Sequence, residues 1–259
     1  MADYLTESFG LSGKVAALTG AGGHLVSEMS SGLARAGVRV VVLDKNPEAA
    51  EKVAAGIRDE GGEAVAGPID VTSKEDFEGA LALALDKFCA LDYAVFGANL
   101  NAPTPFLEIP LQEWHDVIEV QLTGTMLGLQ VFGGHMLDQG QGSMVTISSA
   151  SAGPPLSKAF TYSVAKAGVK NLTQNVAREW AQKGVRVNAL RPGFFPTEWS
   201  QEHFIDDARE AAILGHTAMG RYGEPQELVG AVLWLLSDAA GFVTGAEIAV
   251  DGGFSAMTV

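Results

Sequence analysis

Short apolar runs alternate with stretches of helical periodicity along most of the chain. The runs at 15–19, 38–43, 64–69, 93–96, 143–148, 185–190 and 246–250 predict strands. Helical patterns are expected from about residue 24 to 36, 73 to 88, 110 to 139, 162 to 183 and 225 to 237. Strands that are apolar throughout are typical of a parallel sheet with helices on both faces. The pattern therefore predicts an α/β fold with a doubly wound parallel sheet of about seven strands.

One segment, 194–222, breaks this alternation. It mixes large apolar side chains with the basic residues His203, Arg209, His216 and Arg221. Ligands of open parallel sheets bind beyond the carboxyl ends of the strands, and this segment follows such an end. We interpret it as a substrate lid within a single domain, 1–259; a packing excursion or an oligomer contact is the alternative.

Composition narrows the class of protein. The chain is 47% apolar and 19% charged, which is ordinary for a globular domain. Its formal charge of −14 argues against nucleic acid as a partner, although a local basic pocket can still bind a small anion. We expect no secretory signal and no membrane span, and a cytoplasmic location. Cys89, the only cysteine, excludes an intrachain disulfide and is expected as a small buried side chain at a helix end.

The first strand and its surroundings have the layout of a dinucleotide-binding unit. The run 15–19 ends in a turn that contains Gly20, Gly22 and Gly23, a helical pattern follows, and the next strand closes at Asp44. Glycines let the backbone approach a pyrophosphate, and the acidic residue accepts hydrogen bonds from a ribose. The fold is therefore predicted to be Rossmann-like. For Asp44, a turn or helix-cap role is the alternative.

Tyr162 and Lys166 are candidate catalytic residues. Three residues separate them, so on a helix they lie one turn apart on the same face. A cation beside a phenol favours the phenolate, which lowers the pKa of Tyr162 toward the range useful for acid–base catalysis. Ser149 ends the preceding strand, where its hydroxyl can hydrogen-bond a substrate oxygen. By itself the Tyr-x-x-x-Lys spacing is a weak pattern that also occurs by chance.

With these features together, the whole chain resembles the classical short-chain dehydrogenases/reductases. The resemblance implies that Ser149 positions the substrate oxygen, with Ser148 as the rival, that Tyr162 is the acid–base, and that Lys166 contacts the nicotinamide ribose. Gln121 takes the place of the helix Asn that holds a proton-relay water. The implied cofactor-binding positions are Gly20, Gly22, Gly23, His24, Leu25, Asp44, Asp70, Val71, Ala98, Tyr162, Lys166, Pro192, Gly193, Phe195 and Thr197. No metal ligand is expected.

The chain departs from the family pattern around this site. His24 and Val26 replace the later glycines of the phosphate turn, and Gln121 replaces the helix Asn. The family's Asn-Asn-Ala-Gly after the fourth strand reads Phe96-Gly97-Ala98-Asn99 here, so the polar bracing by the first Asn is lost and Asn99 adds a side chain near the nicotinamide. A degenerate dehydrogenase fold that binds without turnover is therefore a rival hypothesis.

Cofactor and substrate follow from the same comparison. Asp44 favours NAD, because its carboxylate repels the extra phosphate of NADP, although Lys45 offsets part of that repulsion.

The segments 191–198, 216–225 and 251–256 resemble the sugar-acid branch of the family, which includes mannonate (fructuronate) oxidoreductase. We predict reversible oxidation of a secondary alcohol on a sugar acid or other polyhydroxylated small molecule, by a homotetramer. The candidate substrate-binding residues are Asn99, Asn101, His203, Arg209 and His216; Arg221 is an alternative structural ion-pair partner. The competing hypothesis is a general ketone/alcohol reductase whose apolar pocket is formed by Phe106, Trp199 and Phe204.

Overall fold

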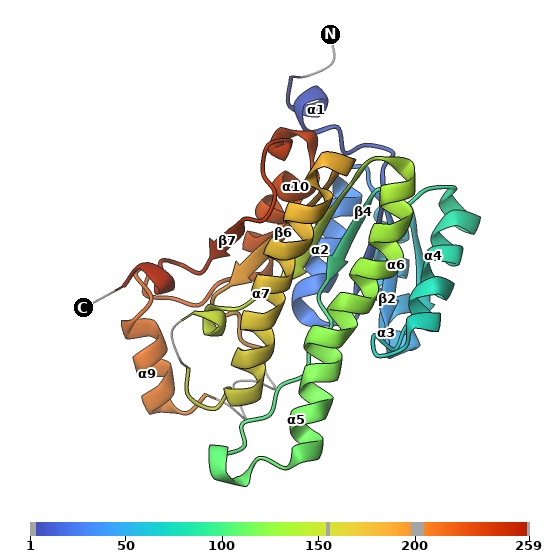
Figure 1. Cartoon of the computed structure of the whole chain (residues 1–259). Coiled ribbons are helices and arrows are strands. Elements are labelled where there is room, and N and C mark those ends of the chain that lie inside the picture. The colour runs from blue at the N-terminus through green and yellow to red at the C-terminus, as the bar shows by residue number, and fades with distance from the viewer. Residues whose placement is uncertain (1–3, 154–155, 198–204, 258–259) are drawn as a thin grey trace.

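A computed structural model describes residues 4–153, 156–197 and 205–257. Its centre is a seven-stranded parallel sheet with the order β3-β2-β1-β4-β5-β6-β7 (Figure 1). The strands are β1 (Val15–Thr19), β2 (Arg39–Asp44), β3 (Ala64–Pro68), β4 (Tyr93–Phe96), β5 (Gly142–Ile147), β6 (Val185–Pro192) and β7 (Glu247–Val250). This order confirms the predicted Rossmann-like doubly wound sheet, and the direction of winding changes between β1 and β4.

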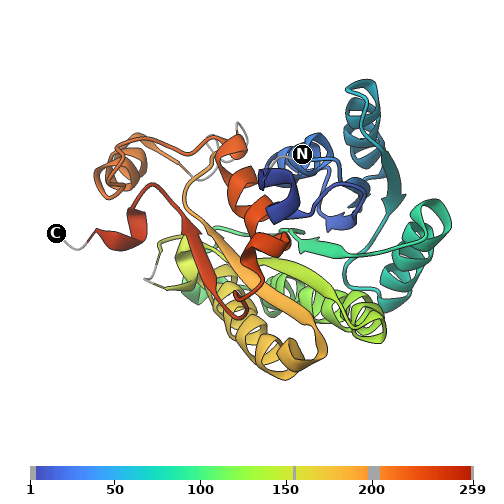
Figure 2. The same ribbon diagram turned by 90° about the horizontal axis from the view of Figure 1, so that it is seen from above.

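Helices cover both faces of the sheet (Figure 2). One layer contains α2 (His24–Arg35), α3 (Pro47–Asp59) and α10 (Val229–Leu236). The other contains α4 (Lys74–Phe88), α6 (Gly124–Gln139) and α7 (Phe160–Trp180). The remaining helices are α1 (Tyr4–Phe9), α5 (Leu111–Ile118) and α9 (Asp207–Gly215). Short 3-10 turns complete the described residues at Phe106–Glu108, Ala150–Ala152, Ala181–Lys183, Pro225–Leu228, Asp238–Ala240 and Phe254–Ala256.

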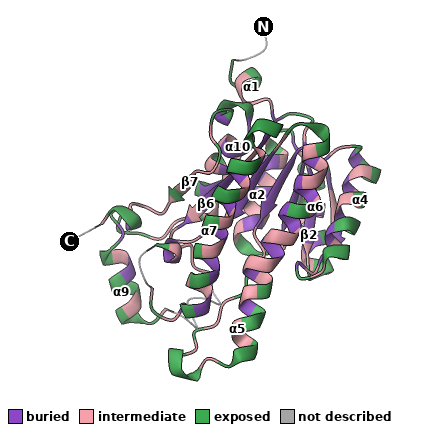
Figure 3. Ribbon diagram, viewed as in Figure 1, coloured by how far each residue is buried: buried purple, intermediate pink, exposed green. Residues whose placement is uncertain are grey.

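Alternation along the strands divides the core into two layers. In β1, Ala16 and Leu18 pack toward the α2 layer, whereas Val15 and Ala17 pack toward the α4 layer. All five residues of this strand are buried, as Figure 3 shows for the central strands in general. Period-two alternation with both faces covered explains why most positions of the strand runs are apolar.

The structure contains helices that the apolar pattern did not predict. In α3, Asn46 accepts hydrogen bonds from the backbone N–H groups of Glu48 and Ala49, and Pro47 occupies the first turn. This is a standard helix start, but the helix buries mainly alanines and so lacks a strong apolar stripe. Helices α1 and α9 were likewise not predicted; α9 lies inside the irregular segment 194–222 and buries only Ile213.

The expectation for Cys89 is wrong in one respect. Cys89 does end a helix, but it is exposed rather than buried. It caps α4 in the left-handed conformation, with φ +58°, while the preceding Phe88 occupies the buried position. A left-handed cap turns the chain away from the helix face, which directs the thiol out of the core.

The long helix predicted at 110–139 is continuous from Leu111 to Gln139 but contains one turn of a different type. Between α5 and α6, residues Glu119–Thr123 form a π-helical turn. Gln121 lies in this turn, and its backbone carbonyl accepts a hydrogen bond of 2.7 Å from the Thr125 hydroxyl. A π turn widens the helix locally and is frequent at functional sites. Within the described ranges, no helix is both long and apolar enough to cross a bilayer.

Candidate active site

A cleft of about 610 Å³ opens at the carboxyl ends of the central strands, across the β1/β4 switch point. Among the predicted site residues, those that line it are Gly20, Gly23, His24, Leu25, Asp44, Asn99, Asn101, Ser148, Ser149, Tyr162, Lys166, Pro192, Gly193, Phe195, Thr197 and Arg209. The predicted residues that are not part of this lining are Gly22, Asp70, Val71, Ala98 and Gln121. The structure therefore brings the phosphate turn, the acidic strand end and the Tyr–Lys helix to one cavity.

Tyr162 and Lys166 face this cleft from the N-terminal part of α7. The Lys166 ammonium nitrogen lies 5.5 Å from the centre of the Tyr162 ring and donates a 2.8 Å hydrogen bond to the carbonyl of Ile147. Only 3% of Lys166 is exposed. The last residue of β5 thus fixes the lysine over the phenol, as the one-turn spacing predicts.

The pKa of Tyr162 differs from the expectation. Burial raises it in the protein alone, and the hydrogen bond with the Ser149 side chain opposes this only in part. Burial also lowers the pKa of Lys166 to about 7. Near neutral pH the lysine is therefore only partly charged, so the positive charge that favours a phenolate is incomplete. The prediction that the pKa of Tyr162 is lowered is therefore wrong: burial raises it.

The side chains of Ser148 and Ser149 have different hydrogen-bond partners. The Ser148 hydroxyl is buried and donates to the Glu247 carboxylate over 2.8 Å. Both serines line the cleft, but the Ser149 side chain is the one that hydrogen-bonds Tyr162. The geometry therefore favours Ser149 as the residue that meets a substrate oxygen.

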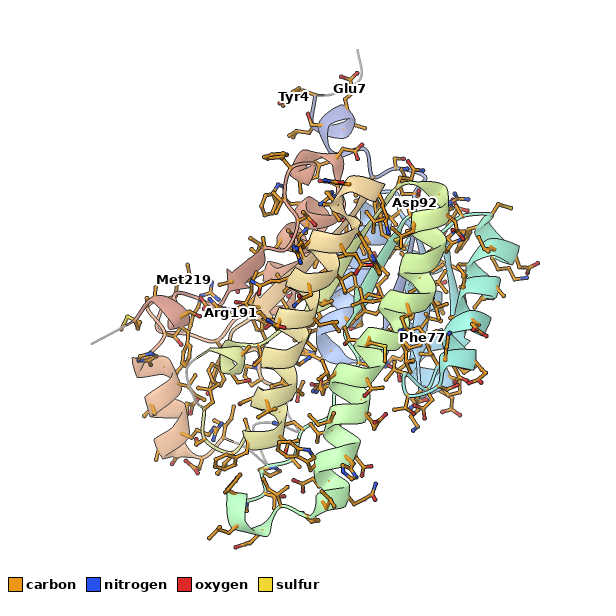
Figure 4. The ribbon with its side chains drawn as sticks, in the orientation of Figure 1. Tyr4, Glu7, Phe77, Asp92, Arg191 and Met219 are labelled. Atoms are coloured by element: carbon orange, nitrogen blue, oxygen red, sulfur yellow. The ribbon has the colours of Figure 1, made fainter. Side chains whose placement is uncertain are left out.

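Glu247 is a residue that the sequence analysis missed. Its carboxylate lies 3.1 Å from both the Lys170 ammonium and the Arg191 guanidinium, and only 9% of its side chain is exposed. Lys170 follows Lys166 by one turn, and Arg191 precedes the segment 192–197; Figure 4 labels Arg191 near the end of β6. The carboxylate thus ties together β5, α7 and β6 behind the cleft. In the sequence, the only sign of this role is that Glu247 is an acidic residue inside the last apolar run, 246–250.

The nucleotide end of the cleft is built on the turn after β1. Gly20 has φ +68°, and a Cβ there would lie 2.7 Å from the backbone of Ala98. The Gly22 N–H donates to Asp44 over 2.9 Å, and the other carboxylate oxygen accepts from the Asn46 N–H. The cap of α3 is Asn46, not Asp44. A left-handed glycine, the N-terminus of α2 and a fixed carboxylate at the β2 end are the features that fit a dinucleotide.

Lys45 forms an ion pair with Asp70. Its ammonium lies 2.7 Å from the Asp70 carboxylate on the surface. The Lys45 ammonium and the Thr72 hydroxyl and N–H together lower the pKa of Asp70 to about 2. Lys45, the basic neighbour of Asp44, is thus already paired with another carboxylate.

Val71, which follows Asp70, is buried against the first turn of α6, where Gly124 leaves room for it.

The departures from the family pattern contact one another. A Cβ at Gly97 would lie 2.4 Å from a methyl group of Val26, so the small residue at 97 makes room for the large one at 26. Gln121 Nε2 donates to Asn99 Oδ1 over 2.7 Å and to the Leu100 carbonyl over 2.8 Å. Gln121 Oε1 is buried without a hydrogen-bond partner in the described part of the chain. The relay role of Gln121 stays a prediction.

The candidate substrate-binding residues divide into those near the cleft and those away from it. Arg209 and Asn101 line it, whereas His216 packs edge-on against the ring of Phe254. Arg221 forms the structural ion pair with Glu227 that was the alternative. Phe106 is exposed and contacts the ring of Phe160 rather than the cleft. The other candidates, His203, Trp199 and Phe204, lie outside the described residues.

Comparison with known proteins identifies the family. The family model described as enoyl-(acyl carrier protein) reductase matches residues 25–255. The 5-keto-D-gluconate 5-reductase of Escherichia coli (strain K12) is 33% identical over 96% of this chain and 98% of its own length. The chain therefore belongs to the short-chain dehydrogenase/reductase family, whose named members here act as dehydrogenases or reductases of CH–OH groups.

Solved structures agree in fold and differ in cofactor. A gluconate 5-dehydrogenase from Burkholderia cenocepacia, in complex with NADP and tartrate, superimposes with a TM-score of 0.91 at 31% identity, covering 95% of this chain and 97% of its own. A candidate D-mannonate oxidoreductase from Haemophilus influenza, with bound NAD, gives 0.90 at 33% identity, covering 96% and 97%. Similarity alone therefore leaves the choice between NAD and NADP to the residues of the site.

Proposed function

We propose that the protein is an NAD-dependent oxidoreductase that interconverts a secondary alcohol and a ketone on a sugar acid. The observation that carries this proposal is the single cleft, which joins the Gly20 turn and Asp44 to Ser149, Tyr162 and Lys166, with Arg209 also on its wall. The bound nicotinamide supplies or accepts the hydride. The residues of the chain hold the two reactants and move the proton.

Tyr162 is the acid–base in this proposal. During oxidation the phenolate oxygen of Tyr162 accepts the hydroxyl proton of the substrate, and the substrate carbon that gives up the hydride becomes the carbonyl carbon of the ketone. In reduction the phenol returns the proton to the carbonyl oxygen. Ser149, already hydrogen-bonded to Tyr162, orients that oxygen. Lys166, buried and fixed by Ile147, favours the phenolate when it is protonated.

The proposed preference for NAD rests on Asp44, the last residue of β2. Asp44 holds a carboxylate at the position where the ribose hydroxyls of a dinucleotide meet this fold. Both of its oxygens accept backbone hydrogen bonds, which fixes the negative charge there. Lys45 is paired with Asp70 and so does not offset this charge for an added phosphate.

A sugar acid is supported by the charge of the cleft. Among the described residues that line it, Arg209 and Lys166 are basic and Asp44, at the nucleotide end, is acidic. Arg209, on α9, donates 2.8 Å hydrogen bonds to the hydroxyl and the carbonyl of Ser157. A guanidinium on the wall of the cleft suits a carboxylate. The names of the relatives, with gluconate and mannonate among their substrates, and the sugar-acid resemblance of the C-terminal segments support the same class.

The Arg209→Gln variant tests the substrate class. We expect KM for gluconate or mannonate to rise about 10- to 100-fold, the loss typical for a charge-assisted hydrogen bond, with KM for a neutral alditol nearly unchanged. Steady-state kinetics on both substrates measures the difference. Arg221→Gln is the matched control, because it removes an exposed arginine that is paired with Glu227. An equal loss on acid and alditol would show that Arg209 only holds α9 to Ser157.

A further inference from the structure

The side-chain contact between Gln121 and Asn99 determines how Asn99 is oriented. Gln121 comes from the π-helical turn and is 1% exposed, whereas Asn99 follows β4, is exposed and lines the cleft. Both residues depart from the family pattern, and Gln121 Nε2 joins them at 2.7 Å. Because these two residues are in contact, we explain both departures together.

The Leu100 carbonyl fixes which way both amides point. A backbone carbonyl only accepts hydrogen bonds, so the Gln121 atom that lies 2.8 Å from it is the NH₂ group. The same nitrogen faces Asn99, which must therefore present Oδ1 to it. The Asn99 Nδ2 group occupies the other branch of its planar amide and points away from Gln121. Asn99 thus offers N–H donors on the side that is not held by the π-helical turn.

We propose that Asn99 is a substrate-binding residue and that Gln121 is the positioning residue that holds it. The Nδ2 group of Asn99 donates to a hydroxyl or carboxylate oxygen of the substrate near the reacting carbon. This rests on the proposed function for the class of substrate, since a simple apolar alcohol has no second oxygen to accept the bond. Nicotinamide and ribose oxygens are also acceptors, so the test measures cofactor binding separately.

The Asn99→Asp variant isolates the donor. Aspartate keeps an oxygen for Gln121 Nε2 but replaces Nδ2 with a second acceptor. We expect kcat/KM for the sugar acid to fall about 10- to 100-fold, mostly through KM, while NADH affinity measured by fluorescence stays within about twofold. Asn99→Gly, which restores the family residue, should show a loss of similar size. Wild-type kcat/KM in both variants, or weakened NADH binding with unchanged substrate KM, would overturn the proposal.

A double-mutant cycle tests the role of Gln121. Gln121→Leu should lower kcat/KM about tenfold when Asn99 is present and have little further effect in the Asn99→Gly background, because the residues act as one unit. Equal losses in both backgrounds would mean that Gln121 acts without Asn99 and would overturn this part. All variants are assayed on the best substrate of the wild type. Failure of the sugar-acid assignment would appear in the wild type itself, whereas failure of this inference would appear only in the variants.

Discussion

Replacement of Tyr162 with Phe is expected to lower kcat roughly 10³-fold while NADH binding stays within about twofold. The change removes one hydroxyl, the group that we propose exchanges the proton with the substrate, and retains the ring beside Lys166. NADH fluorescence titration and steady-state oxidation measure the two effects separately. A large loss of kcat with an unchanged affinity for NADH identifies an acid–base residue rather than a binding residue.

Tyr222→Phe is the control for this experiment. Tyr222 is also partly buried, but it lines a neighbouring cavity of about 390 Å³ together with Arg221 and Glu227, and this cavity shares only Phe194 and Phe195 with the cleft among the described residues. We expect this variant to retain activity close to that of the wild type. Retained turnover in Tyr162→Phe would remove Tyr162 from its role. A parallel loss of NADH binding would instead point to a damaged cleft.

Gly20→Ala has the second large expected effect, on cofactor binding. An alanine at φ +68° costs about 1–2 kcal/mol, and its Cβ would lie 2.7 Å from backbone atoms of Ala98 that cannot rotate away. The turn must shift, which moves the N-terminus of α2 relative to Asp44. We expect the Kd for NADH to rise at least about tenfold, because phosphate binding depends on that backbone geometry.

Gly61→Ala separates the backbone cost from the steric one. Gly61 has φ +87°, and a Cβ there meets nothing within 4 Å. This variant should lose about 1 kcal/mol of unfolding free energy and bind NADH normally. If the two variants bound NADH equally well, the Gly20 turn would not be part of the cofactor site.

Much of the fold could be predicted because its central strands are buried on both faces. Mostly apolar runs predicted all seven strands, and strong apolar periodicity predicted several of the helices. Helix α3 was missed because alanines form most of its buried face, and α9 because it rests on one buried isoleucine. The π-helical turn at Gln121 has no periodic signal at all: it inserts into a helical pattern without interrupting it.

The candidate site was predictable as a set of residues but not as a set of contacts. Spacing along α7 placed Tyr162 and Lys166 together, and the strand order brought the glycine turn to them. Spacing could not show that burial lowers the pKa of Lys166, or that Ser148 turns away to Glu247. Nor could it show that the departures form contacting pairs, because their partners are far apart in the chain.

NAD-linked oxidation of a sugar acid in this cleft is tested by kcat/KM of the wild-type protein with NAD and with NADP over sugar acids, neutral alditols and simple apolar alcohols. We expect NAD to exceed NADP by at least about tenfold, since Asp44 opposes the extra phosphate, and sugar acids to exceed the other alcohols by a similar factor. Faster turnover with NADP, or equal turnover of apolar alcohols and sugar acids, would contradict the account.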